Sequence, residues 1–452
     1  MNALGRLRRR FVIATAVASV VLAGPWPATI ANDARAVTPV WFTAGGARKD
    51  VATALDALRH AAEHGLDPDD YDVPLLERRV AAAQRRTGDP HAIASADVAL
   101  TAAVLRFASD LRFGRVDPAT VAPQFRAPRR DGAFAAGLRD AVAGERLAQA
   151  LAAAKPGFPL YSRLEKLLAH YRALAREPLA SLPPLPAGRK VAVGDRYDGL
   201  AVVRERLLRY GDLQTDAVSL RGDRYSPALA VAIRRFQMRH GLEVDGVIGR
   251  NTLAALAVPP ADRVAQIAVA LERLRWLPDF GTKPIVAINI PSFRLWAFGD
   301  PSRGNVGLST PVIVGEAMRS QTPIFIGEMR SVEFHPYWNV PRSIVRNELL
   351  PTIRRDRSYL QREDMELVGP GGEVESAVDD AALAALAAGK LRVRQRPGPK
   401  NALGRIKFVL PNTMDVYLHD TPARQLFARS RRDFSHGCIR VGDPVALAAF
   451  VL

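Results

Sequence analysis

Cysteine is nearly absent from this chain, which has one thiol, Cys438, among 452 residues. A single cysteine cannot form an internal disulfide. One cysteine and eight scattered histidines also lack the closed ligand spacing of a structural zinc site, so we expect no metal. Free cysteine is often a buried packing residue. Cys438 is therefore either such a residue or a thiol with a chemical task.

Acidic side chains are also scarce, with 46 Asp and Glu against 63 Lys and Arg and a net charge of +17. This excess favours an anionic partner, and nucleic acid, a membrane surface and an anionic cell-wall polymer all qualify. The chain shows no pattern of a nucleic-acid-binding module, and many arginines lie on alanine-rich helical stretches, where a solvated face is the ordinary explanation. We expect no nucleic-acid partner.

The first 36 residues have the pattern of a secretory signal peptide. Arginines at positions 6, 8, 9 and 10 precede an apolar run at 11–24, the helix-breaking Pro25-Trp26-Pro27 and small residues near Ala31 and Ala36. Cleavage after Ala31 or Ala36 would place the rest of the chain in the periplasm. The alternative is an uncleaved inner-membrane anchor, although the run is shorter than the ~20 residues of a spanning helix. In an oxidising compartment, a thiol without a disulfide partner is best explained by chemistry.

Cys438 lies in the stretch Ser435-His436-Gly437-Cys438-Ile439-Arg440-Val441. A nucleophilic thiol needs an imidazole beside it and amide donors nearby. His419 supplies an imidazole near the end of the alternating stretch 415–420, which predicts a strand. Gly437 allows a sharp turn, and the amides of Gly437 and Cys438 are the candidate donors to a developing oxyanion. These residues predict a Cys438–His419 pair with Gly437 in the catalytic loop.

The motif as a whole is more specific than the pair. A histidine, fifteen intervening residues at 420–434 and then Ser-His-Gly-Cys-hydrophobic-Arg resembles the active-site signature of the L,D-transpeptidases, the YkuD-type cysteine enzymes of peptidoglycan. Residues 334–344 and Gln321-Thr322-Pro323 are also similar to that family, in its large-subfamily form with a helical scaffold and a peptidoglycan-binding module. The resemblance covers nearly all of the chain after the signal segment.

The resemblance implies a reaction. Cys438, activated by His419, would attack the carbonyl between diaminopimelate and the terminal D-alanine of a donor tetrapeptide stem, and an amine of a second stem would take the acyl group to form a 3→3 cross-link. The partners are then peptidoglycan stem peptides and glycan, with no cofactor and with carbapenems as expected acylating inhibitors. The alternatives are an L,D-carboxypeptidase, a lipoprotein as acceptor, a generic cysteine peptidase and a non-catalytic wall-binding protein. Oligomeric state is not predicted.

Five further residues are candidates for contact with substrate: Ser435, His436, Arg440, Trp338 and Asn339. Arg440 has the geometry to hold a carboxylate bidentately, and a structural ion pair is the alternative. We expect His436 to line the substrate site rather than act as the base, because a histidine two residues from the thiol aims poorly at it. Trp338 and Asn339 are predicted to line the donor groove, unless Trp338 is a core residue.

The periodicities predict an α+β multidomain protein. A helical scaffold domain at 38–185 ends in a Pro-rich linker at 181–186. A three-helix peptidoglycan-binding module follows at 195–257, in which we expect Asn251 to cap the third helix. A mostly antiparallel β catalytic domain occupies 283–452, with a helical lid insertion at 338–400.

The chain stops at Leu452, fourteen residues after Cys438, in an apolar helix-like run. Larger members of the family typically continue into further strands. We therefore expect a truncated catalytic domain, which bears on its stability and activity more than on its identity.

Overall fold

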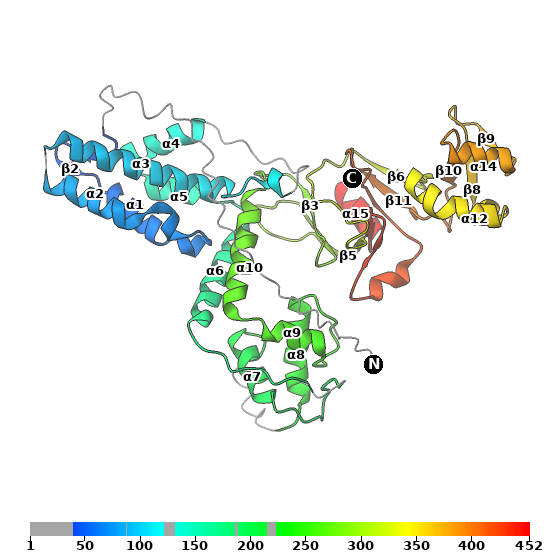
Figure 1. Cartoon of the computed structure of the whole chain (residues 1–452), viewed down its shortest axis with the longest axis horizontal. Helices are drawn as coiled ribbons and strands as arrows, with labels where there is room; N and C mark the ends of the chain where they lie inside the picture. The colour runs from blue at the N-terminus through cyan, green and yellow to red at the C-terminus, as the bar shows by residue number, and fades with distance from the viewer. Residues whose placement is uncertain (1–38, 87, 122–131, 186–188, 215–222) are drawn as a thin grey trace, which may run out of the picture.

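The computed structural model describes residues 39–86, 88–121, 132–185, 189–214 and 223–452. The predicted signal segment lies outside these residues. Figure 1 shows helices in the first part of the described chain, a small helical module in the middle and β-structure toward the C-terminus. This arrangement confirms the predicted α+β multidomain fold.

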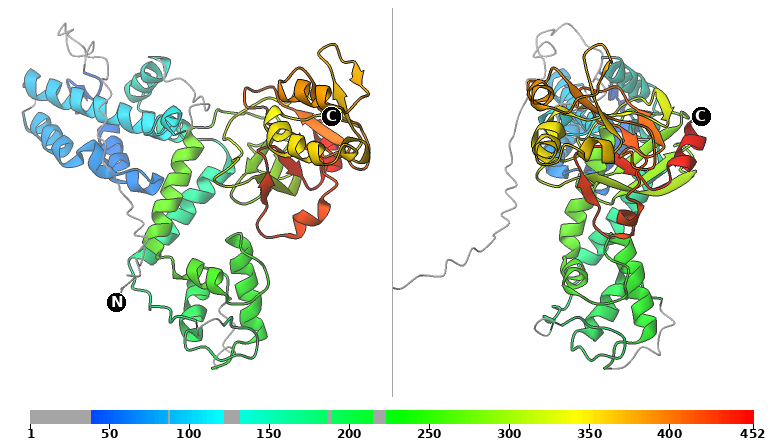
Figure 2. Two further views of the ribbon diagram at one scale, coloured as in Figure 1. Left: turned by 45° about the vertical axis from the view of Figure 1, so that its right-hand side comes forward. Right: turned by 90° about the vertical axis from the view of Figure 1, so that its right-hand side faces the viewer.

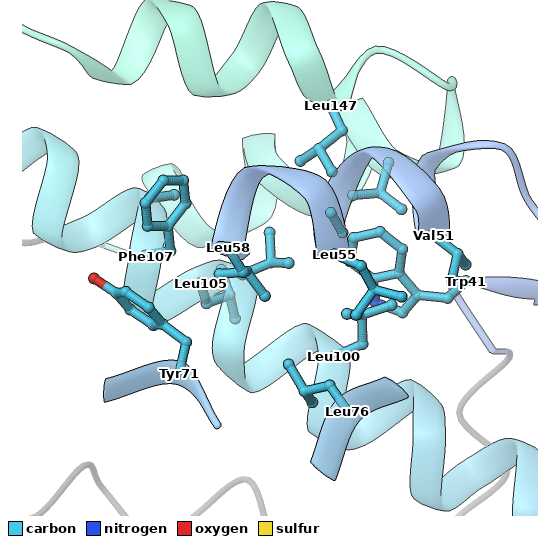
Figure 3. Close-up of a cluster of buried hydrophobic side chains, with 14 of the residues drawn as sticks. Trp41, Val51, Leu55, Leu58, Tyr71, Leu76, Leu100, Leu105, Phe107 and Leu147 are labelled. Carbon is cyan, nitrogen blue, oxygen red and sulfur yellow. The ribbon is translucent and has the colours of Figure 1, made fainter. Parts of the chain in front are cut away.

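The N-terminal region is a helical domain around one core. Its elements are β1 (Phe42–Thr43), β2 (Gly46–Ala47), α1 (Asp50–Arg59), α2 (Val73–Arg85), α3 (Pro90–Phe113), α4 (Gly132–Ala143), α5 (Leu147–Ala154) and the 3-10 turns Ala61–His64, Pro68–Tyr71 and Pro118–Thr120. Trp41, Leu58 and Leu100 are buried together in this core (Figure 3). Length and composition would also suit α3 for a membrane span, but Leu100 and Phe107 are buried in this core.

Two long helices, α6 (Pro159–Ala175) and α10 (Pro260–Arg275), form a stalk (Figure 2). They pack through Leu168 and Leu271, both buried. Arg275 on α10 is fully buried and donates to the Tyr161 hydroxyl at 2.7 Å and to the backbone carbonyl of His64. Since α6 precedes the small module in sequence and α10 follows it, this packing joins the module to the helical domain.

The small module contains α7 (Leu200–Arg209), α8 (Pro227–Arg239) and α9 (Arg250–Ala257) around Val203, Ile233 and Phe236. Ser226 caps α8 as predicted, because its Oγ accepts from Leu229 N at 3.2 Å. The prediction for Asn251 was wrong. The residue at the start of α9 is Gly249, which offers no side-chain cap, and Asn251 lies inside the first turn.

The described part of the Pro-rich stretch is fixed on the module and does not serve as a simple spacer. Leu182 and Leu185 pack against the module core, and the Pro183 carbonyl accepts from the Tyr197 hydroxyl at 2.5 Å. The Ala180 carbonyl accepts from buried Arg206 at 2.7 Å. The prediction of a linker was based on the Pro-rich composition alone. Composition could not reveal these contacts, because the partners of residues 180–185 lie farther along the chain, in the module.

The C-terminal domain is built on a sheet in the order β3-β4-β5-β14-β12-β11-β6. The strands are β3 (Ile285–Asn289), β4 (Arg294–Phe298), β5 (Leu308–Gly315), β6 (Ser331–Phe334), β11 (Ile406–Val409), β12 (Leu418–His419), β14 (Ile439–Val441) and β13 (Asp433–Ser435), which pairs with β5. Only the β12–β14 and β13–β5 pairs are parallel. One face carries Phe408, Leu418 and Ile439 into a core with Leu447 of α15 (Pro444–Val451), so the apolar C-terminal run packs on the sheet.

The insertion between β6 and β11 has its own core around Ile353, Leu367 and Val393. Its elements are β7 (Trp338–Asn339), α11 (Arg342–Ile344), a π-helical turn (Val345–Leu349), α12 (Leu350–Arg355), α13 (Tyr359–Arg362), β8 (Met365–Val368), β9 (Val374–Glu375), α14 (Asp380–Ala387) and β10 (Arg392–Gln395). The expected helices are present. An antiparallel sheet in the order β7-β10-β8-β9 accompanies them, and its strands of two to four residues are too short to show alternation in the sequence.

Candidate active site

The cysteine and the histidine lie on neighbouring strands. Cys438 directly precedes β14, and β12 pairs with β14 in parallel so that His419 is opposite Arg440. The amide of Ile439 donates to the Tyr417 carbonyl at 3.0 Å, which keeps the strands in register at the thiol. Because side chains alternate along a strand and Ile439 faces the core, Cys438 and Arg440 share the opposite face with Tyr417 and His419.

His419 is held in one tautomer. Its side chain is buried, and Nδ1 lies 2.5 Å from the backbone carbonyl of Asp420, which can only accept a hydrogen bond. The proton is therefore on Nδ1, and Nε2 carries the lone pair. Burial, followed by the positive charge of Arg440, lowers the pKa of His419 to about 3. The imidazole is neutral at neutral pH, as a general base must be.

Cys438 rests as a thiol. Burial raises its pKa, while hydrogen bonds from the Tyr417 backbone and hydroxyl and the charge of Arg440 lower it in part. Its Sγ lies 3.6 Å from the Asp415 carbonyl, to which it donates. Among the residues that the structure describes, no hydrogen bond joins this Sγ to His419. The two groups are diagonal neighbours on one face, and a reaction requires the thiol to turn from Asp415 toward the imidazole.

The loop around the thiol is braced by hydroxyl groups. The Ser435 Oγ donates to the Cys438 carbonyl at 2.5 Å and accepts from the Gly437 amide at 3.2 Å. The Thr322 Oγ1 donates to the Gly437 carbonyl at 2.7 Å and accepts from the Gly315 amide at 2.9 Å. The Gly437 N–H is thus engaged within the loop, which leaves the Cys438 N–H as the candidate oxyanion donor.

Gly437 itself has the backbone conformation that its residue type suggests. Its φ is 122°, which side chains of L-residues rarely tolerate. The sharp turn that was expected here is present. Thr322 was noticed only as part of a family-like tripeptide, and its bracing role follows from the fold.

Arg440 is a half-buried cation. Burial lowers its pKa, its Nε has no hydrogen-bond partner, and it forms no ion pair with any described residue. The structural ion pair that was the alternative is therefore not seen in this part of the chain. Its charge acts on Cys438 and His419, and it is free to meet an anionic group.

His436 faces the insertion. Its Nε2 lies 2.7 Å from Oε1 of Glu348 in the π-helical turn Val345–Leu349, and its side chain is 56% exposed. This contact joins the loop that carries Cys438 to the insertion across 88 positions of sequence. The prediction that His436 lines the substrate site stays a prediction.

Tyr417 is the site residue that sequence reasoning did not single out. Burial raises the pKa of Tyr417, and Cys438 and Trp338 lie near enough to its hydroxyl to shift that pKa in opposite directions. Trp338 is therefore connected to the thiol through Tyr417, whereas Asn339 is exposed and pairs with Arg394 in the insertion sheet. The available signal was position, since Tyr417 is two residues before His419 in an alternating stretch and must share its face.

Comparison with known proteins divides the chain in the same way. Residues 33–168 match a family described as "Scaffold domain", residues 196–256 match the "Putative peptidoglycan binding domain", and residues 283–452 match the "L,D-transpeptidase catalytic domain". A "Putative L,D-transpeptidase" of Haemophilus influenzae is 35% identical over 190 residues, which cover 41% of this chain and 37% of that protein. The chain carries an L,D-transpeptidase catalytic domain, preceded by a scaffold domain and a peptidoglycan-binding domain.

Proposed function

We propose that this chain is a cysteine L,D-transpeptidase that forms a thioester on Cys438. One observation carries the proposal: a neutral imidazole with a free Nε2 shares a sheet face with the single thiol. A neutral thiol beside a neutral imidazole favours general-base catalysis, in which the Cys438 proton moves to His419 as Sγ attacks. A preformed thiolate is not required.

In the first half of the reaction, Sγ attacks the carbonyl between diaminopimelate and the terminal D-alanine. The oxygen of the tetrahedral intermediate becomes negative, and the Cys438 N–H and the Arg440 charge stabilise it. The C–N bond then breaks, and the D-alanine amine leaves with the proton that His419 had taken. Because the pKa of His419 is about 3, its imidazolium gives up this proton readily.

In the second half, an amine of another stem attacks the thioester and gives its proton to His419. Collapse of the intermediate forms the 3→3 amide bond and returns the proton to the thiolate of Cys438. If water attacks in place of the amine, the product is a shortened stem, which is the L,D-carboxypeptidase outcome. Acceptors of both kinds use the same acyl-enzyme.

The test is intact mass after incubation with a carbapenem. One covalent adduct on the wild-type chain and none on Cys438→Ser is expected, because an alkoxide is far less accessible than a thiolate. With a tetrapeptide donor, free D-alanine and 3→3 dimers should appear. Acylation of Cys438→Ala at the wild-type rate would remove the thiol from the mechanism.

A non-catalytic wall-binding protein is the second candidate. The observation in its favour is that the Cys438 Sγ donates to Asp415 and its pKa is raised. Binding to purified sacculi without any adduct or D-alanine release would select this candidate.

Periplasmic localisation by cleavage of the N-terminal signal is also part of the proposal. The basic, apolar and small-residue order of the first 36 residues supports it. N-terminal sequencing of protein from the periplasmic fraction should give a start near Asn32 or Val37. Intact Met1 in the membrane fraction would select the anchor.

A further inference from the structure

A cavity of about 280 Å³ lies on the peptidoglycan-binding module, between the loop that follows α8 and the start of α9. Its volume is close to the lower end of the ~300–1,000 Å³ range of small-molecule pockets. The catalytic chemistry proposed above does not use this cavity.

The floor of the cavity is preorganised. Gln237 is 1% exposed, and its amide nitrogen donates to Asp245 Oδ1, Thr252 Oγ1 and the Val247 carbonyl at 2.8–3.1 Å. Its amide oxygen accepts from Gly246 N at 2.9 Å. These bonds use all the donors of the side chain, so Gln237 holds the loop in shape and the residues above it are left to meet a ligand.

The wall of the cavity carries both signs of charge. Lys190 and Arg250 supply two cations, and Glu243 and Asp245 supply two carboxylates. None of these four forms an ion pair with another residue that the structure describes, and all four are exposed. Separate, unneutralised charges of opposite sign around one cavity match a ligand that itself carries a carboxylate and an ammonium group.

No aromatic ring is present among the described residues that line the cavity; Leu242 and Val247 are its largest apolar members. An aromatic ring offers a flat apolar face to the C–H side of a sugar, and that surface is missing here. The glycan strand of peptidoglycan presents hydroxyl and acetamido groups, whereas a stem peptide with diaminopimelate presents free carboxylate and ammonium groups. The residues that line the cavity therefore favour the stem peptide over the sugar as the ligand.

We propose that this cavity binds the zwitterionic end of a peptidoglycan stem peptide, with Arg250 and Lys190 at the carboxylate and Glu243 at the ammonium. The inference rests on a peptidoglycan-binding role for residues 196–256, as their family match suggests, and it specifies the ligand. The module then recognises peptide stems whose terminal carboxylate and ammonium groups are free. These are the part of the wall on which the catalytic domain is proposed to act, and tethering there raises the local concentration of donor and acceptor.

The test measures binding by the full chain to three probes: purified sacculi, glycan strands stripped of stems, and the free tripeptide L-Ala-γ-D-Glu-diaminopimelate. Arg250→Glu and Glu243→Lys should each weaken binding of the tripeptide at least tenfold in calorimetry and reduce sedimentation with sacculi. Arg235→Glu is the matched control, because Arg235 is an exposed cation on α8 outside the cavity, and it should stay within twofold of wild type.

Three results separate the possible failures. If the wild-type chain binds stripped glycan and not the tripeptide, and Arg250→Glu binds glycan unchanged, the peptide assignment is wrong while wall binding stands. If the wild-type chain does not sediment with sacculi, the wall-binding function fails and the inference with it. If Arg250→Glu loses its fold by circular dichroism, Glu243→Lys and the milder Lys190→Ala decide the matter, and unchanged tripeptide affinity in both overturns the assignment.

Discussion

At the scale of single residues, the site is set by burial more than by direct pairing. His419 stays neutral because a buried imidazolium would lose its hydration and face Arg440. Cys438 stays protonated because a buried thiolate is costly, although Tyr417 and Arg440 offset part of that cost. Both groups therefore rest uncharged, and in the proposed reaction charge develops only during attack.

The first prediction separates the two histidines. His419→Ala should lower the rate of carbapenem acylation by about 10²–10⁴, the usual contribution of a positioned general base. His436→Ala should have a smaller effect, mainly on substrate affinity, because His436 contacts Glu348 of the lid. Stopped-flow or mass-resolved acylation of folded variants provides the measurement. If His436→Ala showed no acylation while His419→Ala reacted at the wild-type rate, His436 would be the base instead.

The second prediction concerns pH. Burial raises the pKa of Cys438. The rate of alkylation by iodoacetamide should therefore rise with pH and level off at a higher pH than for an ordinary thiol. Arg440→Gln removes a positive charge that favours the thiolate and should move the profile to still higher pH, while Arg440→Lys should restore most of the shift. A profile that is the same in Arg440→Gln and wild type would mean that the charge does not act on the thiol.

At the scale of elements, the catalytic loop depends on a segment more than a hundred residues earlier. The Thr322 hydroxyl bridges the Gly437 carbonyl and the Gly315 amide and thus ties the loop to the end of β5. The approach is so close that a Cβ on Gly315 would lie 2.0 Å from the Ser320 carbonyl oxygen. Gly315 and Thr322 therefore form one support for the loop that carries Cys438.

Thr322→Val tests this support. The side chain keeps its shape but leaves a buried amide and a buried carbonyl without partners, so the free energy of unfolding should fall by about 1–3 kcal/mol per unsatisfied group. Acylation should slow as the loop loses its position. Thr322→Ser retains the hydroxyl and should keep the acylation rate near wild type. Denaturant unfolding and acylation kinetics are the two measurements, and equal acylation by Thr322→Val and Thr322→Ser would exclude a bracing role.

The lid contact is testable by a double-mutant cycle. His436 and Glu348 are both about half exposed, so their pair should contribute only ~0.2–1 kcal/mol. Glu348→Ala and His436→Ala should each raise KM for a tetrapeptide donor. Because each single change already removes the contact, the KM of the double variant should not exceed the higher of the two single-variant values. Strict additivity of the two effects would show that the residues act independently.

At the scale of the whole molecule, separate cores are joined by a stalk. The catalytic sheet, the insertion, the module and the helical domain each have their own buried cluster, while α6 and α10 pack together between them. Arg275 joins α10 to α6 through Tyr161 and connects this stalk to the helical domain through the His64 carbonyl. Glu272 adds to the connection, because its Oε1 accepts from the Arg115 and Val116 amides.

Arg275→Ala should therefore loosen the helical domain from the stalk. Removal of the buried guanidinium leaves the Tyr161 hydroxyl, the His64 carbonyl and the Glu272 carboxylate without their cation, a cost of about 3–5 kcal/mol. Calorimetry should show an earlier transition for the helical domain, and limited proteolysis should cut near α6. Carbapenem capture at Cys438 should persist, because the catalytic domain has its own core. Loss of capture in a folded variant would instead indicate one cooperative unit.

The sequence alone determined the features that depend on neighbouring residues. Helical periodicity predicted α1, α3, α7 and α8, because an amphipathic helix repeats every 3.6 residues within one segment. Alternation at 415–420 predicted the strand that carries His419, and the residue type of Gly437 predicted the turn before β14, because both are local properties. Asn251 was misassigned as a cap because Gly249 begins the helix without a side chain that the pattern could reveal.

The tertiary structure alone decided which distant segments meet. Trp338 reaches Tyr417, Thr322 supports Gly437 and Glu348 contacts His436, each across tens of residues or more. Strands such as β7 and β10 contain too few residues to show alternation, and they form only because each finds its partner and a shared core. Local periodicity records which face of an element is apolar. The pairing of elements depends on the packing of many side chains at once, and no short stretch of sequence contains that information.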